Sequence, residues 1–305
     1  MLSPSPAQNP AADLRTQIDL LFAEHVMIVA KETAAAVNHS DEYTPYTTLL
    51  GANSADLSAV VGRAYGSTTA SQFRQTWDAQ NGYLVDYAIG VVSHNDDKAN
   101  AAMAALQNVR LLDGIALKGQ AADDKTFIDD LMGQRYASFY ADLHLAYAHT
   151  QVTGDALASQ IVKRFPDKFP GRIDGADVAG RVAMNLLLQE HNYVATMATD
   201  AAVAKRDAEK AAAVSALTTS AKGLPQEWLD WDHVLVASAT GADPSVSGFA
   251  GKLMAATGAS LSVTTHYVQA TVKVVDDQKA KTPAMLATDD RAAATATQPI
   301  ADALG

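Results

Sequence analysis

Apolar residues recur along almost the whole chain at the three- and four-residue spacing of an amphipathic helix. Alternation of the kind that predicts a half-buried strand is nearly missing, and the short run Val272–Val275 lies within a helical pattern. Pro45 in a first turn and Gly66, which suits a left-handed cap, mark the limits of one helix. In the first half the pattern predicts helices over about 13–37, 41–65, 70–91, 98–112 and 124–165. Between residues 112 and 122 it is compatible with further helix but does not require it.

The segment 165–177 is the clearest break in this pattern. It holds two prolines, two glycines and alternating charges, which together end a helix. We therefore expect a disordered lead-in over 1–12, a first helical bundle over 13–165, a linker over 166–177 and a second, shortened bundle over 178–305.

The second half repeats the first. The stretch 21–37 returns as 187–203, with His25 falling on His191, an offset of 166 residues (191 − 25). Later matches pair Asp123 with Asp276, an offset of 153 (276 − 123), and Asp155 with Asp302, an offset of 147 (302 − 155). Offsets that only fall along the chain are expected when the second of two copies has lost loop residues. The predicted fold class is all-α, with two tandem antiparallel (up-and-down) helical bundles related by internal duplication.

Charge and composition exclude several classes of function. The chain carries 23 Lys and Arg against 34 Asp and Glu, a net charge of −11, and has no basic cluster, so we expect no nucleic-acid partner. Cysteine is absent, which removes disulfides, thiolate catalysis and zinc fingers. No run of about 18 apolar residues occurs, so no membrane span is expected.

The first residues, MLSPSPAQNPAADL, lack the basic and apolar segments of a signal peptide. Stretches rich in Pro, Ser and Ala often follow a signal peptide that has been removed. We therefore expect a secreted or cell-surface protein.

One histidine lies at the same inward position in both copies. On the buried seam of its helix, His25 follows Leu21 and precedes Ile28, and His191 has corresponding aliphatic neighbours. An imidazole among aliphatic side chains needs a hydrogen-bond partner. Either a neighbouring helix supplies a carbonyl, a carboxylate or a bound water, or several histidines converge on a metal ion.

The offsets place further histidines at equivalent positions. The equivalent pairs are His233 with Gln80 (233 − 80 = 153), His266 with Asp113 (266 − 113 = 153) and His149 with Ala296 (296 − 149 = 147). Three imidazoles inside a bundle can bind Zn²⁺ or Cu²⁺ and leave a position open. We therefore predict a copper or zinc ion in the second copy, held by His191, His233 and His266. In the first copy the predicted ligands, which suit a harder or weaker site, are His25, His149, Glu24, Glu32 and Asp113.

Three sequence features carry a resemblance to known proteins. They are Glu24-His25 near the start of a helix, Trp77 followed by NGYLVDY over 81–87, and AYAH…DALA…IVKRFPDKFPG over 146–171. With these the chain resembles a group of secreted bacterial all-helical tandem-repeat proteins, some of which are labelled copper-amine-oxidase-like. In that group the position of Gln80 is often His, so the first copy departs from the pattern. The chain has no quinone-precursor context in a β-rich pattern that would support the oxidase label.

These observations predict a metal-binding helical-bundle protein that is non-catalytic or weakly catalytic. The alternative is a structural or adhesive tandem-bundle module with no metal, in which the histidines are buried and hydrogen-bonded. An enzyme that uses a cavity in the bundle has no motif behind it, since both a phosphate-binding glycine loop and a nucleophile elbow are missing from the sequence.

Overall fold

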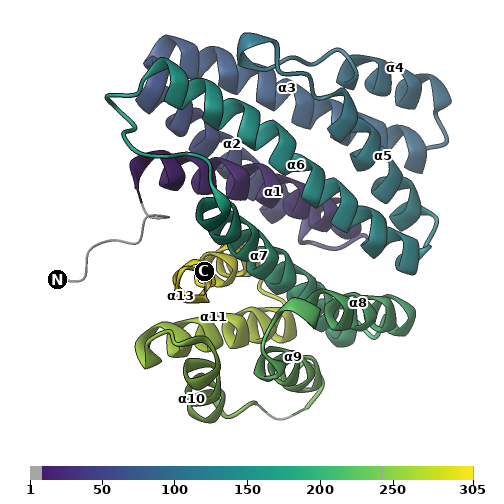
Figure 1. Cartoon of the computed structure of the whole chain (residues 1–305). Helices are drawn as coiled ribbons and strands as arrows, with labels where there is room; N and C mark the ends of the chain where they lie inside the picture. The colour runs from purple at the N-terminus through teal and green to yellow at the C-terminus, as the bar shows by residue number, and fades with distance from the viewer. Residues whose placement is uncertain (1–8, 242, 305) are drawn as a thin grey trace. The chain divides into compact units, whose positions relative to one another are not determined.

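The computed structural model describes residues 9–241 and 243–304, and over these ranges it is all-helical without a β-strand (Figure 1). The chain divides into two compact units, Met1–Val182 and Ala183–Gly305, and the boundary falls inside helix α7 (Ala176–Val203). Of the predicted lead-in 1–12, residues 1–8 lie outside the described ranges. The last three are helical instead, because Pro10 suits a first helical position and Asn9 caps the helix by accepting hydrogen bonds from the next backbone N–H groups.

The first unit contains six complete helices within its described residues: α1 (Pro10–Val37), α2 (Tyr43–Tyr65), α3 (Ser67–Val92), α4 (Asp96–Leu106), α5 (Lys118–Met132) and α6 (Tyr136–Arg164). The predicted limits of α1, α2 and α3 agree with these bounds to within a few residues. Gly66 ends α2 at a φ of 90°, a left-handed value that glycine adopts without a steric penalty. Residues 165–175, between α6 and α7, form the expected break.

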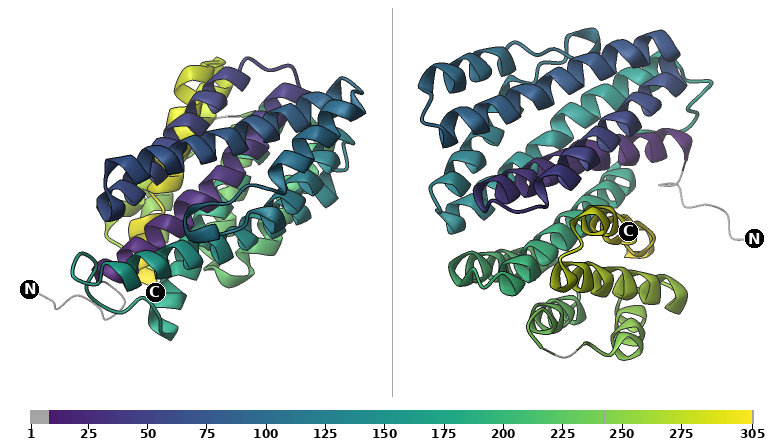
Figure 2. Two further views of the ribbon diagram at one scale, coloured as in Figure 1. Left: turned by 90° about the horizontal axis from the view of Figure 1, so that it is seen from above. Right: turned by 180° about the vertical axis from the view of Figure 1, so that it is seen from behind.

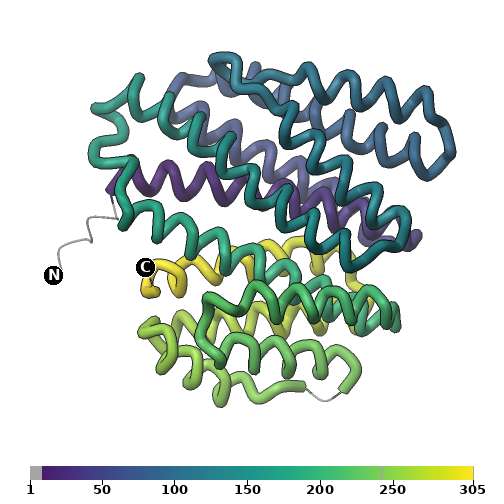
Figure 3. The backbone as a smooth tube through the Cα atoms, turned by 45° about the vertical axis from the view of Figure 1, so that its right-hand side comes forward, coloured from purple at the N-terminus to yellow at the C-terminus, as the bar shows by residue number. Residues whose placement is uncertain are grey.

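Two predicted helices in this unit are wrong. The helix expected over 124–165 is divided between α5 and α6, which turn back on each other (Figure 3). The turn contains Gln134, which has a φ of 55°. A glutamine gives little sequence signal for a left-handed residue, so the turn is hidden in the pattern. The helix expected through residue 112 ends at Leu106, and the loop that follows buries Val109 and Leu111 without forming helix.

Helix α1 is the centre of the first unit. Every residue from Phe22 to Thr33 is buried, and such a helix has to be surrounded by others. It packs against α2, α5 and α6, which can be followed around it in Figures 1 and 2. An apolar core cluster collects side chains from α1, α2, α3 and α6, among them Ile18, Phe22, Leu57, Phe73, Trp77, Leu157 and Ile161.

The second unit has the same kind of centre. Helix α7 is buried at every position from Leu188 to Thr199. The other helices of the unit are α8 (Asp207–Ser220), α9 (Gln226–Ser238), α10 (Val246–Thr257), α11 (Leu261–Ala280), α12 (Pro283–Thr295) and α13 (Gln298–Leu304). The predicted helical character of Val272–Val275 is confirmed, since this run lies within α11.

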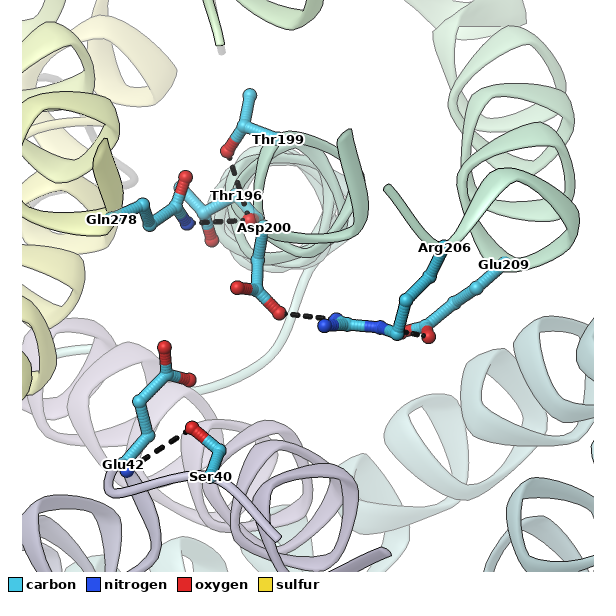
Figure 4. Close-up of polar contacts among 8 residues, drawn as sticks. All are labelled: Ser40, Glu42, Thr196, Thr199, Asp200, Arg206, Glu209 and Gln278. Carbon is cyan, nitrogen blue, oxygen red and sulfur yellow. Dashed lines mark hydrogen bonds and ion pairs between the residues drawn. The ribbon is translucent and has the colours of Figure 1, made fainter. Parts of the chain in front are cut away.

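Polar contacts from α11 and from the turn before α8 help to hold α7 to its neighbours (Figure 4). Gln278 Nε2 of α11 donates to the backbone oxygen of Thr196, 2.9 Å away. At the turn into α8, Arg206 donates to Asp200 at 2.5 Å and to Glu209 at 2.7 Å. The side chain of Arg206 thereby connects the end of α7 with the first turn of α8. Among the described helices, none is both long and apolar enough to cross a membrane.

Candidate functional site

A cavity of about 460 Å³ lies in the first unit, where α1, α2 and α3 meet. Its walls are mostly aliphatic and include Val29 and Ala35 of α1, Leu50 of α2, and Leu84 and Val85 of α3. Pockets that bind small molecules have this character, with an apolar lining, few polar groups and a volume of roughly 300–1,000 Å³.

Large apolar side chains on the cavity lining remain exposed. Ile89 is 45% exposed and Val92 is 48% exposed, although both line the cavity from α3. Ser40 and Ser93, from the turns that follow α1 and α3, add hydroxyl groups to the lining. The cavity is therefore partly open, and apolar side chains lie where it meets solvent.

Among the described residues that line the cavity, Glu32 of α1 is the one with a carboxylate side chain. Its side chain is only 4% exposed, and Thr47 of α2 donates a hydrogen bond to Oε1 over 2.6 Å. Burial raises the pKa of Glu32 above its ordinary value, while the hydrogen bond from Thr47 opposes the shift. Glu32 is one of the predicted metal ligands, and the structure places it in an apolar cavity next to a hydroxyl group.

Asn81 of α3 connects this cavity with the buried histidine of the first unit. It lines the cavity, and its Oδ1 accepts a hydrogen bond from His25 Nε2–H over 2.7 Å. Its Nδ2 donates to Ser54 Oγ of α2 over 3.0 Å. The ring of His25 also lies against Trp77, with 4.7 Å between the ring centroids. A neighbouring helix thus supplies the partner that a buried imidazole requires.

Burial lowers the pKa of His25 to about 4, so the imidazole is neutral at pH 7. The substitution Asn81→Asp places a carboxylate beside Nε2 and should raise this pKa, because a nearby negative charge favours the imidazolium form. An NMR titration of the imidazole resonances measures the shift. The exposed Asn108→Asp provides the control and should leave the pKa of His25 near 4; equal pKa values in the two variants would contradict the assignment.

The second unit buries its histidine in a related hydrogen-bonded group. His191 Nε2–H of α7 donates to Asp232 Oδ2 of α9 over 2.6 Å, and its Nδ1 lies 2.8 Å from Ser220 Oγ at the end of α8. His191 and Asp232 are both at most 1% exposed. Serine, histidine and aspartate also form catalytic triads, but there the nucleophile faces a substrate site. Ser220 is only partly buried, but the ring and the carboxylate are enclosed in the core, where their hydrogen bond gives them the structural role of holding α9 against α7.

Two further predicted ligands have protein partners in the first unit. Glu24 is buried, and its Oε2 accepts a hydrogen bond from Asn53 Nδ2 over 2.8 Å. His149 is half-buried, and its Nδ1 lies 2.5 Å from Asp123 Oδ2 of α5. Both side chains therefore connect neighbouring helices.

The remaining predicted ligands lie on the surface. Asp113 is exposed in a short turn, and His233 and His266 are exposed on α9 and α11. Within the described part of the chain, no group of three or more His, Asp or Glu side chains is arranged to hold a metal ion. Binding of copper or zinc by these residues stays a prediction.

A buried acid with a second, partly exposed acid beside it lies elsewhere in the first unit. Asp19 of α1 is fully buried, and Gly154 of α6 leaves room for it, because a Cβ at Gly154 would come within 2.0 Å of Asp19 Oδ1. Asp155 lies nearby and binds Arg15 through two hydrogen bonds of 2.5 and 2.9 Å. Burial first, and then the charge of Asp155, raise the pKa of Asp19 well above its ordinary value, against the effect of Arg15.

Sequence reasoning missed Asn81 and Asp232, the partners of the two histidines. A signal for both was present, since each follows a fully buried tryptophan, Trp77 or Trp228, by four residues, one helical turn. The chain matches no protein-family model, no curated protein and no solved structure, so its membership of a family stays a prediction.

Proposed function

We propose that the first unit binds a small apolar molecule in the cavity between α1, α2 and α3. One observation carries this proposal: about 460 Å³ of space lies against aliphatic walls in a helical unit that also holds a core cluster of large side chains. Burial of an apolar ligand there would remove both the ligand and the exposed Ile89 and Val92 from water.

A cavity-filling substitution tests this function. Ala88 lines the cavity from α3, and Ala88→Phe should reduce the affinity for hexanol at least tenfold, because the new ring occupies the space of the ligand. Isothermal titration calorimetry measures the affinity. Ala148→Phe, the same change at an exposed position of α6, is the matched control and should bind hexanol as the unchanged protein does. Absence of hexanol binding to the unchanged protein, or equal binding by both variants, would refute the proposal.

We also propose that the two units are helical bundles that arose by duplication of one ancestral bundle. Matching turn residues support this. His39 after α1 and Lys205 after α7 have φ values of 51° and 58°, at an offset of 166 (205 − 39). Gln134 after α5 and Lys281 after α11 both have φ of 55°, at an offset of 147 (281 − 134). Left-handed residues that are not glycine are uncommon, so their coincidence with the sequence offsets favours a common origin.

The buried polar groups support the same proposal. Ser54 and Ser220 lie near the two histidines at an offset of 166 (220 − 54), and Asn81 and Asp232 bind the same ring atom at an offset of 151 (232 − 81). This last pairing differs from the offset of 153 by which the sequence paired Gln80 with His233, and it is also smaller than the later offset of 153 between Asp123 and Asp276, so the offsets do not fall at every step. On it, His233 is not the counterpart of Gln80, which removes one reason for expecting His233 as a ligand.

Two further equivalent pairs are Asp19 with Asn185 and Asp155 with Asp302. The offsets are 166 (185 − 19) and 147 (302 − 155), as in the sequence repeat. In the second unit Asn185 Nδ2 donates to Asp302 Oδ1 over 3.0 Å. In the first unit the position of the amide donor is taken by the buried Asp19, whose raised pKa favours a protonated carboxyl group that can donate in the same way.

A further inference from the structure

The buried carboxyl group of Glu32 suggests which ligand the cavity takes. Thr47 is its hydrogen-bond partner, and among the described residues Glu32 has no ion-pair partner. The neighbouring Lys31 is engaged elsewhere, with its Nζ 5.6 Å from the centre of the Tyr46 ring. An acid held in an aliphatic cavity without a cation costs free energy unless a ligand compensates it or the acid takes up a proton.

We propose that the ligand is a small apolar amine whose ammonium group pairs with Glu32 while its hydrocarbon part fills the aliphatic cavity. This inference rests on the proposed function, since it assumes that the cavity binds a ligand at all. The structure carries it through the position of one acid, Glu32, in a lining that otherwise offers mainly carbon atoms, hydroxyl groups and the amide of Asn81.

Electrostatics favours an amine over other apolar ligands of the same size. An ion pair is strengthened when its surroundings have a low dielectric constant and its charges approach closely. A carboxylate ligand would instead meet the like charge of Glu32 and the net charge of −11 of the chain. A neutral alcohol could form a hydrogen bond with Glu32 but would not neutralise its charge.

Among the described residues, the side chains around Glu32 do not pair with its charge, so neutralising that charge is left to the ligand. Tyr43 of α2 is a neutral phenol near the carboxylate, and burial together with the charge of Glu32 raises the pKa of Tyr43. His39 also lines the cavity but is an exposed residue of the turn after α1. Neither side chain forms an ion pair with Glu32 within the described residues.

Calorimetric titration with three six-carbon probes tests the inference at pH 7. Hexylamine should bind at least tenfold more tightly than hexanol, and hexanoate should bind more weakly than hexanol. In Glu32→Gln, which keeps the size and hydrogen-bonding capacity of the side chain, hexylamine should lose this advantage while the affinity for hexanol stays within about twofold. Unchanged hexanol binding also shows that the variant keeps an intact cavity.

Glu42→Gln is the matched control, because it removes the same charge from the adjacent turn outside the cavity lining, and it should leave the preference for hexylamine unchanged. Equal affinities of hexanol and hexylamine for the unchanged protein would overturn the amine assignment and leave the proposed function standing. A preference for hexylamine that survives in Glu32→Gln would likewise overturn it. If hexanol does not bind to the unchanged protein, the proposed function itself fails, and the amine assignment that rests on it fails with it.

Discussion

Asp232→Ala is expected to lower the free energy of unfolding of the second unit by about 3 kcal/mol or more. The substitution removes the acceptor of His191 Nε2–H, which is 2.6 Å from Asp232 Oδ2 in the intact protein. Because His191 is fully buried, water cannot replace the lost acceptor without entering the core. The deleted carboxyl group also leaves an empty volume between α7 and α9, which adds to the loss.

Urea unfolding followed by tryptophan fluorescence measures this effect, since Trp228 and Trp231 lie in the same helix as Asp232. Asp232→Asn keeps an oxygen acceptor for the ring, as Asn81 provides for His25, and should cost about 1.5 kcal/mol or less. Asp230→Ala, an exposed change in the same helix, should alter the stability by no more than about 0.5 kcal/mol. If Asp232→Ala unfolds at the same urea concentration as Asp230→Ala, the assignment of His191 and Asp232 to a structural role is wrong.

The substitution Asp19→Asn should stabilise the protein at neutral pH and have little effect near pH 4. The folded state holds Asp19 with a pKa well above 3.8, its ordinary value, so between these two pKa values the folded chain binds a proton that the unfolded chain does not. Stability therefore falls as the pH rises through this window, by up to about 1.4 kcal/mol per pH unit for one proton. Asparagine donates a hydrogen bond without needing a proton, as Asn185 does towards Asp302.

The measurement is the difference in the free energy of unfolding between Asp19→Asn and the unchanged protein at several pH values from 4 to 8. Two other buried groups also make the stability depend on pH: burial lowers the pKa of His25 to about 4 and raises the pKa of Asp124 to about 7. Both groups are present in both proteins, so their contributions drop out of the difference. Asp13→Asn, an exposed change in the same helix, should give a small difference that does not grow with pH. A stabilisation by Asp19→Asn that is the same at pH 4 and pH 8 would contradict a protonated Asp19.

The helical fold could be predicted from the sequence because its apolar spacing is helical almost everywhere. The helix limits failed where the signal is not apolar spacing. Gln134 turns the chain with a left-handed backbone that its residue type does not suggest, and the loop after Leu106 carries apolar residues that pack without a helix. Local pattern predicts an element, whereas turns of this kind depend on the helices that pack beside them.

The candidate site was less predictable. The inward position of His25 and His191 follows from helical spacing alone, and both residues are buried. Their partners come from a third helix, and the sequence does not specify how far that helix is rotated or shifted along its neighbours. The cavity also depends on how the helices are rotated and shifted, because Glu32 and Asn81 belong to different helices and line the same cavity only after these have packed.

The double engagement of Asn81 has one more consequence. Its amide holds His25 on one side and forms part of the cavity wall on the other. Any molecule that reorients this amide on entering the cavity also changes the acceptor offered to the imidazole, and with it the proton affinity of His25. Thermodynamic reciprocity then requires protonation of His25 to change the affinity for that molecule by the same factor. The chemical shift of a ring in the interior can thus serve as a built-in indicator of occupancy.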